Sequence, residues 1–280
     1  MLKELTVRDL DGGLNLVDIG CSGDLDAKWD PVLHLINYVG FDPNKEECER
    51  LNAEPSTFHS KQYLPFAVYD GKDHTLYKTA SIYCYSLRPP NRPWLDRFAY
   101  RDLFEVVGTE TVSTRRLDSI KELAGMDVDA IKVDSQGLDR SILESGEDLL
   151  KAAMYVEAEP GFLENYSGEE TFSEVDIYLR EKGFLLFDLE LFRQPRTGEL
   201  GKASPVQQLL WCQGLWLHDF IAHPPAERLT RGKALKTLLL CAVTSCWDFG
   251  LELAEGYRRA DLITDDELKK LTKNSAWDLL

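Results

Sequence analysis

Acidic side chains follow short apolar runs in this chain, where a parallel sheet would place them close to a bound ligand. Asp134 follows the run Ala130–Val133, and Glu157 and Glu159 stand at the end of the run Met154–Ala158. In open parallel sheets, ligands bind beyond the carboxyl ends of the strands. A carboxylate at that edge can accept the proton of a reacting hydroxyl group. We therefore predict Asp134 and Glu159 as candidate catalytic bases, with helix capping as the alternative for Asp134 and ordinary surface exposure as the alternative for Glu159.

A glycine-containing turn, with the sequence VDIGCSGD from Val17, follows the first apolar run at Leu14–Ile19. Such a turn lets the backbone approach a ligand closely. It lacks the G-x-G-x-x-G pattern of dinucleotide sites, because Ser22 and Leu25 occupy the second and third glycine positions. Asp18 would repel a phosphate and suits a cationic ligand such as S-adenosylmethionine. An ordinary strand-to-helix turn is the alternative.

A second acidic residue, Asp42, ends the next apolar run at Tyr38–Phe41. An acid at this point of an α/β unit can accept hydrogen bonds from both hydroxyls of an adenosine ribose. Its alternative role is the N-cap of a helix that begins at Pro43. Both roles are compatible with the sequence.

The elements that would position these residues alternate between strand and helix patterns. Strand-like runs occur at Leu14–Ile19, Tyr38–Phe41, Tyr63–Tyr69, Ala130–Val133 and Met154–Ala158. Two more, Phe184–Phe192 and Gln208–Leu217, follow one another without an intervening helix and predict an antiparallel hairpin. The fold class is therefore α/β, a mostly parallel sheet with helices on both faces and an antiparallel edge hairpin.

The last part of the chain has a helical pattern from His223 onward, with apolar residues at helical spacing between Leu235 and Val243. Thr264 and Glu267 form a capping box for the last helix, as Thr171 and Glu174 do for an earlier one. We expect these C-terminal helices to pack against the sheet or over the acceptor side, without touching the donor.

Composition limits the partners of the protein. The 280 residues carry a formal net charge of -16, which disfavours nucleic acid and acidic membrane surfaces as partners. The N-terminus lacks the apolar segment of a secretion signal, and no apolar stretch is long enough to span a bilayer. Six cysteines without a CxxC pair favour reduced thiols, and we predict a cytoplasmic protein without nucleic acid or membrane partners. The oligomeric state is not predicted.

Taken together, the segments resemble the FkbM-type methyltransferase family. The matching pieces extend from about Leu14 to Glu190, with a looser similarity in QLLWCQGLWLHD from Gln208. They are VDIGCSGD, GFDPN, FAVYDGKDHTLY, YSLRPPN, RRLDSI, DAIKVDSQGLDRSILESGEDLL, VEAEPGF and FSEVDIYLREKGFLLFDLE.

This resemblance implies a Rossmann-like class I methyltransferase fold with a seven-stranded sheet, S-adenosylmethionine as donor, and O-methylation of sugars or secondary metabolites. It places cofactor-binding residues at Asp18, Gly20, Cys21, Ser22, Gly23, Asp42, Ser86, Asp134 and Gln136. The chain departs from the family in the Cys21-Ser22 pair of the glycine turn and in having one serine, Ser86, where members often have two.

We therefore predict a methyltransferase domain at residues 1–220 and a C-terminal helical extension at residues 221–280, acting on a small-molecule or glycan acceptor. No motif demands a metal, although assistance by Mg²⁺ at Asp134 stays open. The alternatives are a nicotinamide-dependent Rossmann oxidoreductase and a non-catalytic binding module of a biosynthetic or glycan assembly.

Overall fold

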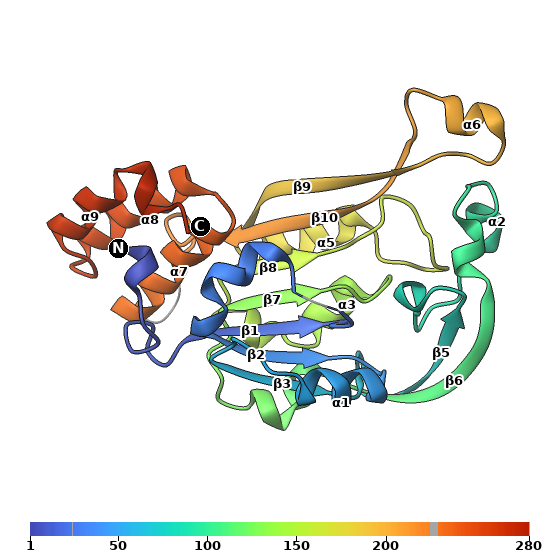
Figure 1. Ribbon diagram of the computed structural model, residues 1–280, viewed down its shortest axis with the longest axis horizontal. Coiled ribbons are helices and arrows are strands. Elements are labelled where there is room, and N and C mark those ends of the chain that lie inside the picture. The colour runs from blue at the N-terminus through green and yellow to red at the C-terminus, as the bar shows by residue number, and fades with distance from the viewer. Residues whose placement is uncertain (24, 225–228, 280) are drawn as a thin grey trace.

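The structure is a computed structural model that describes residues 1–23, 25–224 and 229–279. Asp24, the last residue of the glycine-turn motif, and Pro225 in the C-terminal segment lie outside the described residues. Within these ranges, seven strands form one sheet in the order β3-β2-β1-β7-β8-β10-β9 (Figure 1). Their bounds are β1 Leu14–Ile19, β2 Ile36–Phe41, β3 Ser60–Leu64, β7 Ala130–Val133, β8 Tyr155–Ala158, β9 Phe184–Gln194 and β10 Gln208–His218.

The sheet has the arrangement that the sequence predicts. Strands β3, β2, β1, β7 and β8 pair in parallel, and β10 is antiparallel both to β8 and to β9. The order in which the chain adds strands to the sheet reverses at β1 and β7, since β2 and β3 lie on one side of β1 and the later strands lie on the other. In α/β sheets this switch point is where a ligand crevice opens beyond the strand ends.

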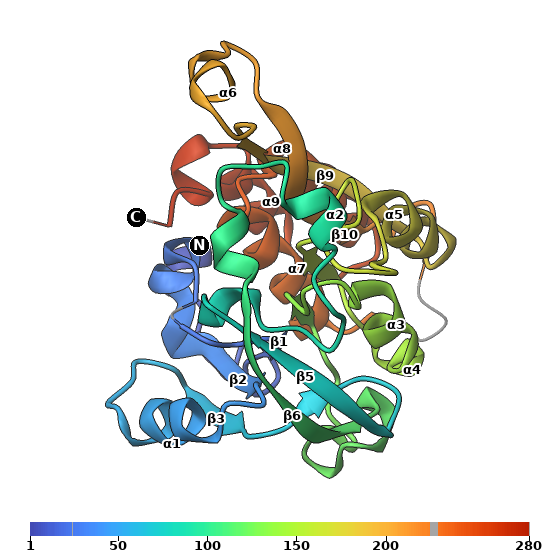
Figure 2. The ribbon, with the colours of Figure 1, turned by 90° about the vertical axis from the view of Figure 1, so that its right-hand side faces the viewer.

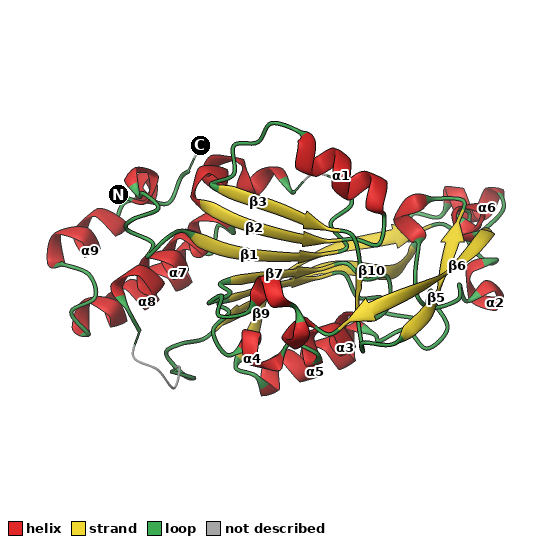
Figure 3. Cartoon of the chain, turned by 90° about the horizontal axis from the view of Figure 1, so that it is seen from below, coloured by secondary structure: helices red, strands yellow, loops and turns green. Residues whose placement is uncertain are grey.

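Helices cover both faces of this sheet. α1 lies on one face, and α3, α4 and α5 lie on the other (Figure 3). Because side chains alternate along a strand, Leu14 and Leu16 belong to the core on the α1 face, while Val17 and Ile19 belong to the core under α3 and α5. The helices are α1 Lys45–Ala53, α2 Arg92–Leu95, α3 Asp139–Glu144, α4 Glu147–Leu150, α5 Phe172–Glu181, α6 Glu199–Ala203, α7 Arg231–Val243, α8 Trp247–Arg259 and α9 Asp265–Leu271.

Shorter 3-10 helices complete the chain. One of them, Ala27–Leu35, replaces an α-helix between β1 and β2, and the segment Leu117–Leu123 contains two separate turns. The others are Leu2–Glu4, Ile82–Cys84, Arg101–Phe104 and Asn274–Ala276, and the two turns are Leu117–Ser119 and Lys121–Leu123.

The single strand predicted at Tyr63–Tyr69 is wrong. Pro65 has no N–H to donate, so the pairing of β3 ends at Leu64, and a separate strand β4 follows at Ala67–Val68. β4 belongs to a second sheet of order β4-β6-β5 in the described chain, with β5 at Asp73–Thr79 and β6 at Val106–Arg115. This sheet crosses in front of the carboxyl ends of the main sheet (Figure 2).

Two capping predictions are confirmed and one is wrong. Capping boxes start α5 at Thr171 and α9 at Thr264. The N-cap of α1 is Asn44, whose side chain accepts from the N–H of Glu47 at 3.2 Å, and not Asp42. Asp42 lies two residues before this cap, and its Oδ1 accepts from the N–H of Asn44 at 2.7 Å, which precedes the first helical residue.

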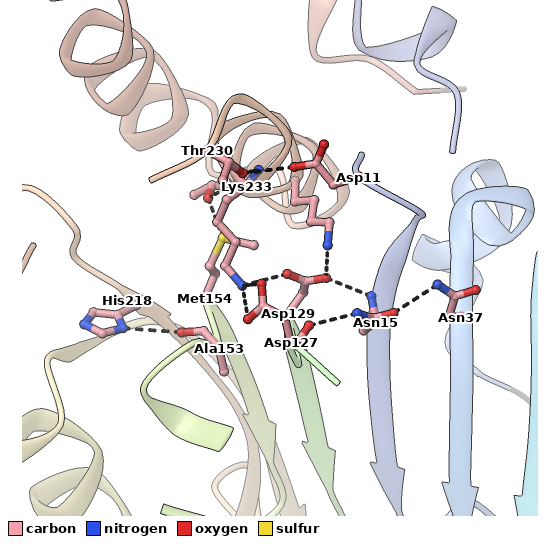
Figure 4. Close-up of polar contacts among 12 residues, drawn as sticks. Asp11, Asn15, Asn37, Asp127, Asp129, Ala153, Met154, His218, Thr230 and Lys233 are labelled. Carbon is pink, nitrogen blue, oxygen red and sulfur yellow. Dashed lines mark hydrogen bonds and ion pairs between the residues drawn. The ribbon is translucent and has the colours of Figure 1, made fainter. Parts of the chain in front are cut away.

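Helices α7, α8 and α9 lie at the amino ends of the parallel strands, next to the N-terminus of the chain (Figure 1). They share one core with Leu2, Leu10 and Leu14, so of the two expected positions they take the one against the sheet. A polar cluster joins α7 to the loop before β7, where Lys233 and the fully buried Asp129 form an ion pair of 2.8 Å (Figure 4). The division of the chain into two domains at residue 220 remains a prediction, and the apolar core continues across this residue.

Strands β9 and β10 extend beyond the sheet as an arm with α6 at its tip (Figure 1). The arm meets the loop after α2, where the N–H of Ala99 donates to the carbonyl of Pro195 at 3.0 Å. No helix in the described part of the chain combines the length and apolarity needed to cross a membrane.

Candidate functional site

A cavity of about 450 Å³ opens at the carboxyl ends of β1, β2 and β7, at the switch point of the sheet. Its floor comes from the turns after these strands, and its outer wall comes from β5, β6 and the 3-10 helix Ile82–Cys84. Six of the nine predicted cofactor residues line it, namely Gly20, Ser22, Asp42, Ser86, Asp134 and Gln136. Ligand cavities of proteins fall in this size range.

Gly20 forms the closest point between the two central turns. Its backbone has a φ of +82°, and a Cβ built there would lie 2.0 Å from the carbonyl oxygen of Asp134. The Asp134 N–H donates to the carbonyl of Ile19 at 2.9 Å, which ties the two strand ends together. Glycine is therefore required here by both conformation and space.

Asp42 lines the cavity from the end of β2 and is 8% exposed. Its Oδ2 accepts from the Ser22 hydroxyl at 2.8 Å, so the glycine turn and the β2 end are also connected. Burial raises the pKa of Asp42, while the hydrogen bonds from the Asn44 N–H and Ser22 act in the opposite direction.

Three predicted cofactor residues do not line the cavity. Cys21 is buried, and Gly23 has a φ of +100° with open space around it. Asp18 points to the α1 face, where its carboxylate accepts from the Tyr38 hydroxyl at 2.8 Å and lies 3.4 Å from Lys132 Nζ. Burial raises the pKa of Asp18, and Lys132 and Tyr38 partly offset this rise.

Asp18 belongs to a row of charged residues that crosses three strands. The register pairs Asp18 with Lys132 and Lys132 with Glu157, so their side chains share one face of the sheet. Glu157 is 2% exposed and accepts hydrogen bonds from Lys28, the Tyr155 hydroxyl and Gln213. With its oxygens occupied, Glu157 is held as a partner of cations rather than left as a free base.

Asp134 lies in the turn after β7, where Gln136 and Ser86 define its surroundings. Gln136 Nε2 donates to Asp134 Oδ1 at 2.6 Å, and the Ser86 hydroxyl donates to the Gln136 carbonyl at 2.7 Å. Helix α3 begins only at Asp139, and the Ser135 hydroxyl accepts from the Leu138 N–H at 2.9 Å. The capping role considered for Asp134 is therefore wrong, because the N-cap residue of α3 is Leu138 and no side chain caps this helix.

Glu159 follows β8 and is half-buried beside Asp134, although it does not line the cavity itself. Burial, the negative charge of Asp134 and a hydrogen bond to Asp134 raise the pKa of Glu159 to about 9. The fully buried Asp139 adds to the negative charge, and burial raises its own pKa to about 7. Glu159 is therefore protonated at neutral pH and shares its proton with the neighbouring carboxylate.

Sequence reasoning missed two residues of this region. Lys132 lies within β7 and pairs with Asp18. The segment DAIKVD places this lysine between buried apolar residues, and that position was the signal in the sequence that could have identified it. Tyr166 contacts Gln136 from the loop between β8 and α5, and no spacing in that irregular segment indicates the contact.

The cavity residues fit S-adenosylmethionine by their chemistry. Asp42 can accept hydrogen bonds from ribose hydroxyls, the backbone of the Gly20 turn can approach the ligand, and carboxylates rather than lysines dominate the floor, as a cationic ligand requires. In the described residues, histidine, cysteine and acidic side chains form no group of three or more that could hold a metal ion.

The fold and the site thus define a Rossmann-like protein with a ligand cavity at its switch point. The methyltransferase FkbM domain model matches residues 21–186, and the chain belongs to this family. It is an S-adenosylmethionine-dependent methyltransferase, and the nicotinamide-dependent alternative is not supported. Comparison with curated protein sequences gives no match.

Solved structures give more distant similarities. A Streptococcus pneumoniae protein proposed to be a tRNA (m1A22) methyltransferase, with S-adenosyl-L-methionine bound, is 12% identical, with 93% of this chain and 91% of that chain covered and a TM-score of 0.36. A Streptococcus agalactiae protein of the NADB-Rossmann superfamily is 10% identical, covering 96% and 92%, with a TM-score of 0.36. Magnesium protoporphyrin IX methyltransferase from Synechocystis PCC 6803 is 9% identical, covering 76% of each chain, with a TM-score of 0.34. Similarities this distant do not define a substrate.

Proposed function

We propose that this methyltransferase methylates a hydroxyl oxygen of a small acceptor of the sugar or secondary-metabolite type. The observation that carries the proposal is the pair formed by Asp134 at the donor cavity and the protonated Glu159 beside it. A hydroxyl group needs a base when it attacks a methyl group, and a carboxylate next to the cavity can supply one.

S-adenosylmethionine supplies an electrophilic methyl group on a positively charged sulfur when it is bound. In this proposal Gly20, Ser22, Asp42 and Ser86 hold the donor, and the Gln136 amide holds Asp134. Asp134 accepts the acceptor's hydroxyl proton as the new carbon–oxygen bond forms and the carbon–sulfur bond breaks. Positioning of the two reactants contributes much of the rate.

The acidity of the protein supports a small acceptor. The net charge of -16 would repel the phosphates of a nucleic acid. All six cysteines lie among the described residues and are free thiols, which supports the predicted cytoplasmic location.

The test uses the full chain with donor labelled in the methyl group and a panel of monosaccharides and hydroxylated metabolites, with an RNA transcript for comparison. We expect label in a methyl ether, which survives alkaline hydrolysis, whereas a methyl ester does not. Label found only on nitrogen, on a carboxylate or on the RNA contradicts the proposal. Donor binding without any transfer would favour the non-catalytic alternative.

A substitution assigns the base. Asp134→Asn keeps the size of the side chain and removes its charge, so turnover should fall by about 10²–10⁴ if Asp134 is the base. Donor affinity should change little. Methyl transfer by this variant at the wild-type rate in a single turnover would exclude Asp134 as the base.

A further inference from the structure

We propose that Tyr166 is a positioning residue for the methyl transfer, acting through the Gln136 side chain to orient Asp134. The inference rests on the proposed function for its kinetic consequence, but not for its geometry. Tyr166 OH donates to Gln136 Oε1 at 2.8 Å, and Gln136 Nε2 donates to Asp134 Oδ1 at 2.6 Å. Each donor in this chain meets an acceptor, so the polarity runs from the tyrosine to the carboxylate.

Gln136 is held in a backbone conformation that indicates a special role. Its φ is +56°, a left-handed conformation that is unfavourable for a non-glycine residue, and Ser86 holds it there by donating to its carbonyl. Conformations of this kind persist only where surrounding contacts enforce them. This backbone conformation directs the Gln136 carboxamide toward Asp134, and the hydrogen bond from Tyr166 fixes the rotation of the carboxamide.

The charge on Asp134 decides which way the carboxamide faces. If the Gln136 oxygen and nitrogen were exchanged, the oxygen would lie 2.6 Å from a carboxylate oxygen and the two would repel. Tyr166 has one hydroxyl proton, and its contact with Gln136 is shorter than its 3.2 Å contact with the Cys84 carbonyl. The hydroxyl therefore reinforces the orientation in which the Gln136 amide donates to Asp134 Oδ1.

Tyr166 is itself held rigidly. It is 2% exposed, and its ring packs against Phe104 with 5.7 Å between the ring centroids. Its N–H donates to Glu169 Oε2 at 3.0 Å, and Glu169 also accepts from the N–H groups of Gly161 and Asn165. The buried Glu169 carboxylate thus holds together the loop that contains Tyr166.

This loop also contacts the turn that carries Gln136. The N–H of Glu170 donates to the carbonyl of Gly137 at 3.3 Å. Gly137 has a φ of +107°, and a Cβ there would lie 3.6 Å from the Tyr166 ring. The two segments are therefore in direct contact, and a movement of the loop would reach Asp134 through Gln136.

The experiment compares Tyr166→Phe with the wild-type full chain. Phenylalanine keeps the ring packing and removes only the hydroxyl. We expect kcat to fall between about 10-fold and 100-fold, as misplacement of a reacting group does, while the KM for the donor stays unchanged. Gln136→Ala should lower kcat similarly, and the double variant should be no slower than either single one.

A second measurement requires no acceptor. The Gln136 side-chain amide signal in a ¹⁵N–¹H spectrum, assigned by its absence in Gln136→Ala, should shift toward that of a freely rotating amide in Tyr166→Phe. The matched control is Tyr100→Phe, because the Tyr100 hydroxyl donates to Asn165 in the same loop at 3.2 Å. Tyr100→Phe should leave both the amide signal and kcat unchanged.

Three results would overturn the proposal: an unchanged amide signal in Tyr166→Phe, wild-type kcat in that variant, or kcat losses that multiply in the double variant. If no hydroxyl acceptor is methylated by the wild type, the proposed function fails, and the amide signal still decides whether Tyr166 holds Gln136. The two failures are therefore distinguishable.

Discussion

At the scale of single residues, the carboxylates of this site differ through their surroundings and not through their type. Asp18 and Glu157 are paired with lysines on one face of the sheet. Asp134 accepts a hydrogen bond from the side-chain amide of Gln136 at the cavity. Glu159 is buried beside a like charge and keeps its proton. When the surroundings of two neighbouring acids separate their pKa values, one acid can act as a proton acceptor and the other as a proton donor.

Asp42 allows the first prediction. Asp42→Ala should weaken donor binding more than tenfold, because hydrogen bonds from two ribose hydroxyls to a charged group contribute about 1.5–3 kcal/mol. Since Asn44 and not Asp42 caps α1, this loss should not include the removal of a helix cap. Calorimetric titration with S-adenosylmethionine measures it. Thr264→Ala, which removes the cap of α9, is the control: it should cost about 1 kcal/mol of stability and leave affinity intact. Unchanged affinity in Asp42→Ala would exclude the ribose role.

Glu159 allows a prediction about pH. Its pKa rises from 4.5 in the unfolded chain to about 9 in the folded protein, so the folded state binds the proton more tightly. The stability that this group contributes is fully present below about pH 4.5 and is lost as the pH rises toward 9. Glu159→Gln, which resembles the protonated acid, should lose less stability across this range than the wild type.

Urea unfolding measured across that pH range checks the difference, and Glu252→Gln at an exposed position is the control. If the wild type and Glu159→Gln lose stability in parallel, Glu159 is not protonated in the folded protein at neutral pH.

At the scale of elements, the sequence predicts the bounds of two strands that are buried on both faces. β1 and β7 have the predicted bounds, because their short apolar runs end at a charged residue or a glycine. Asp134 could be assigned to a strand end for the same reason. Tyr166 could not be assigned, since it reaches Gln136 from an irregular loop whose shape depends on one buried glutamate, and hydrophobic periodicity contains no information about such contacts.

The turn after β1 gives the prediction at this scale. Gly20→Ala should abolish donor binding and destabilise the protein by several kcal/mol, because the new Cβ would meet the Asp134 carbonyl at 2.0 Å. Gly125→Ala is a matched control with a φ of +76° and open space, so it should lose only about 1–2 kcal/mol. Chemical unfolding and donor titration of both variants separate the effect of close contact from that of backbone conformation. Equal losses of stability would mean that the contact with Asp134 is relieved at no cost.

At the scale of the whole molecule, the cavity and the C-terminal helices occupy opposite ends of the parallel strands (Figure 1). The core under α7 includes Leu10, Leu14 and Leu16 from the beginning of the chain, so the two ends of the sequence complete one core. The sequence predicted the helices and left two places open for them, against the sheet or over the acceptor side, because an apolar helical face does not specify which surface it covers. Removing the segment would expose that core, and a point substitution is therefore the better probe of its role.

The ion pairs of Asp129 allow the role of the C-terminal helices to be tested by substitution. Asp129 is completely buried before β7, where it accepts from the Asn15 N–H at 2.8 Å and pairs with Lys233 and Lys236 of α7 at 2.8 and 2.7 Å (Figure 4). Lys236→Met should lower the free energy of unfolding by about 2–4 kcal/mol, because it leaves a buried carboxylate with part of its compensation removed. Asp129→Asn should be comparable, and the double variant should lose less than the sum, since neither charge is then left alone.

Lys151→Met is the control, because Lys151 pairs with Asp148 at 2.5 Å on the exposed surface and such pairs contribute about 0–1 kcal/mol. Donor affinity should be the same in Lys236→Met and the wild type when both are folded, since the cavity lies at the other end of the sheet. Additive losses in the double variant, or a loss no larger than that of Lys151→Met, would mean that the ion cluster does not hold α7 to the sheet and that apolar packing alone does.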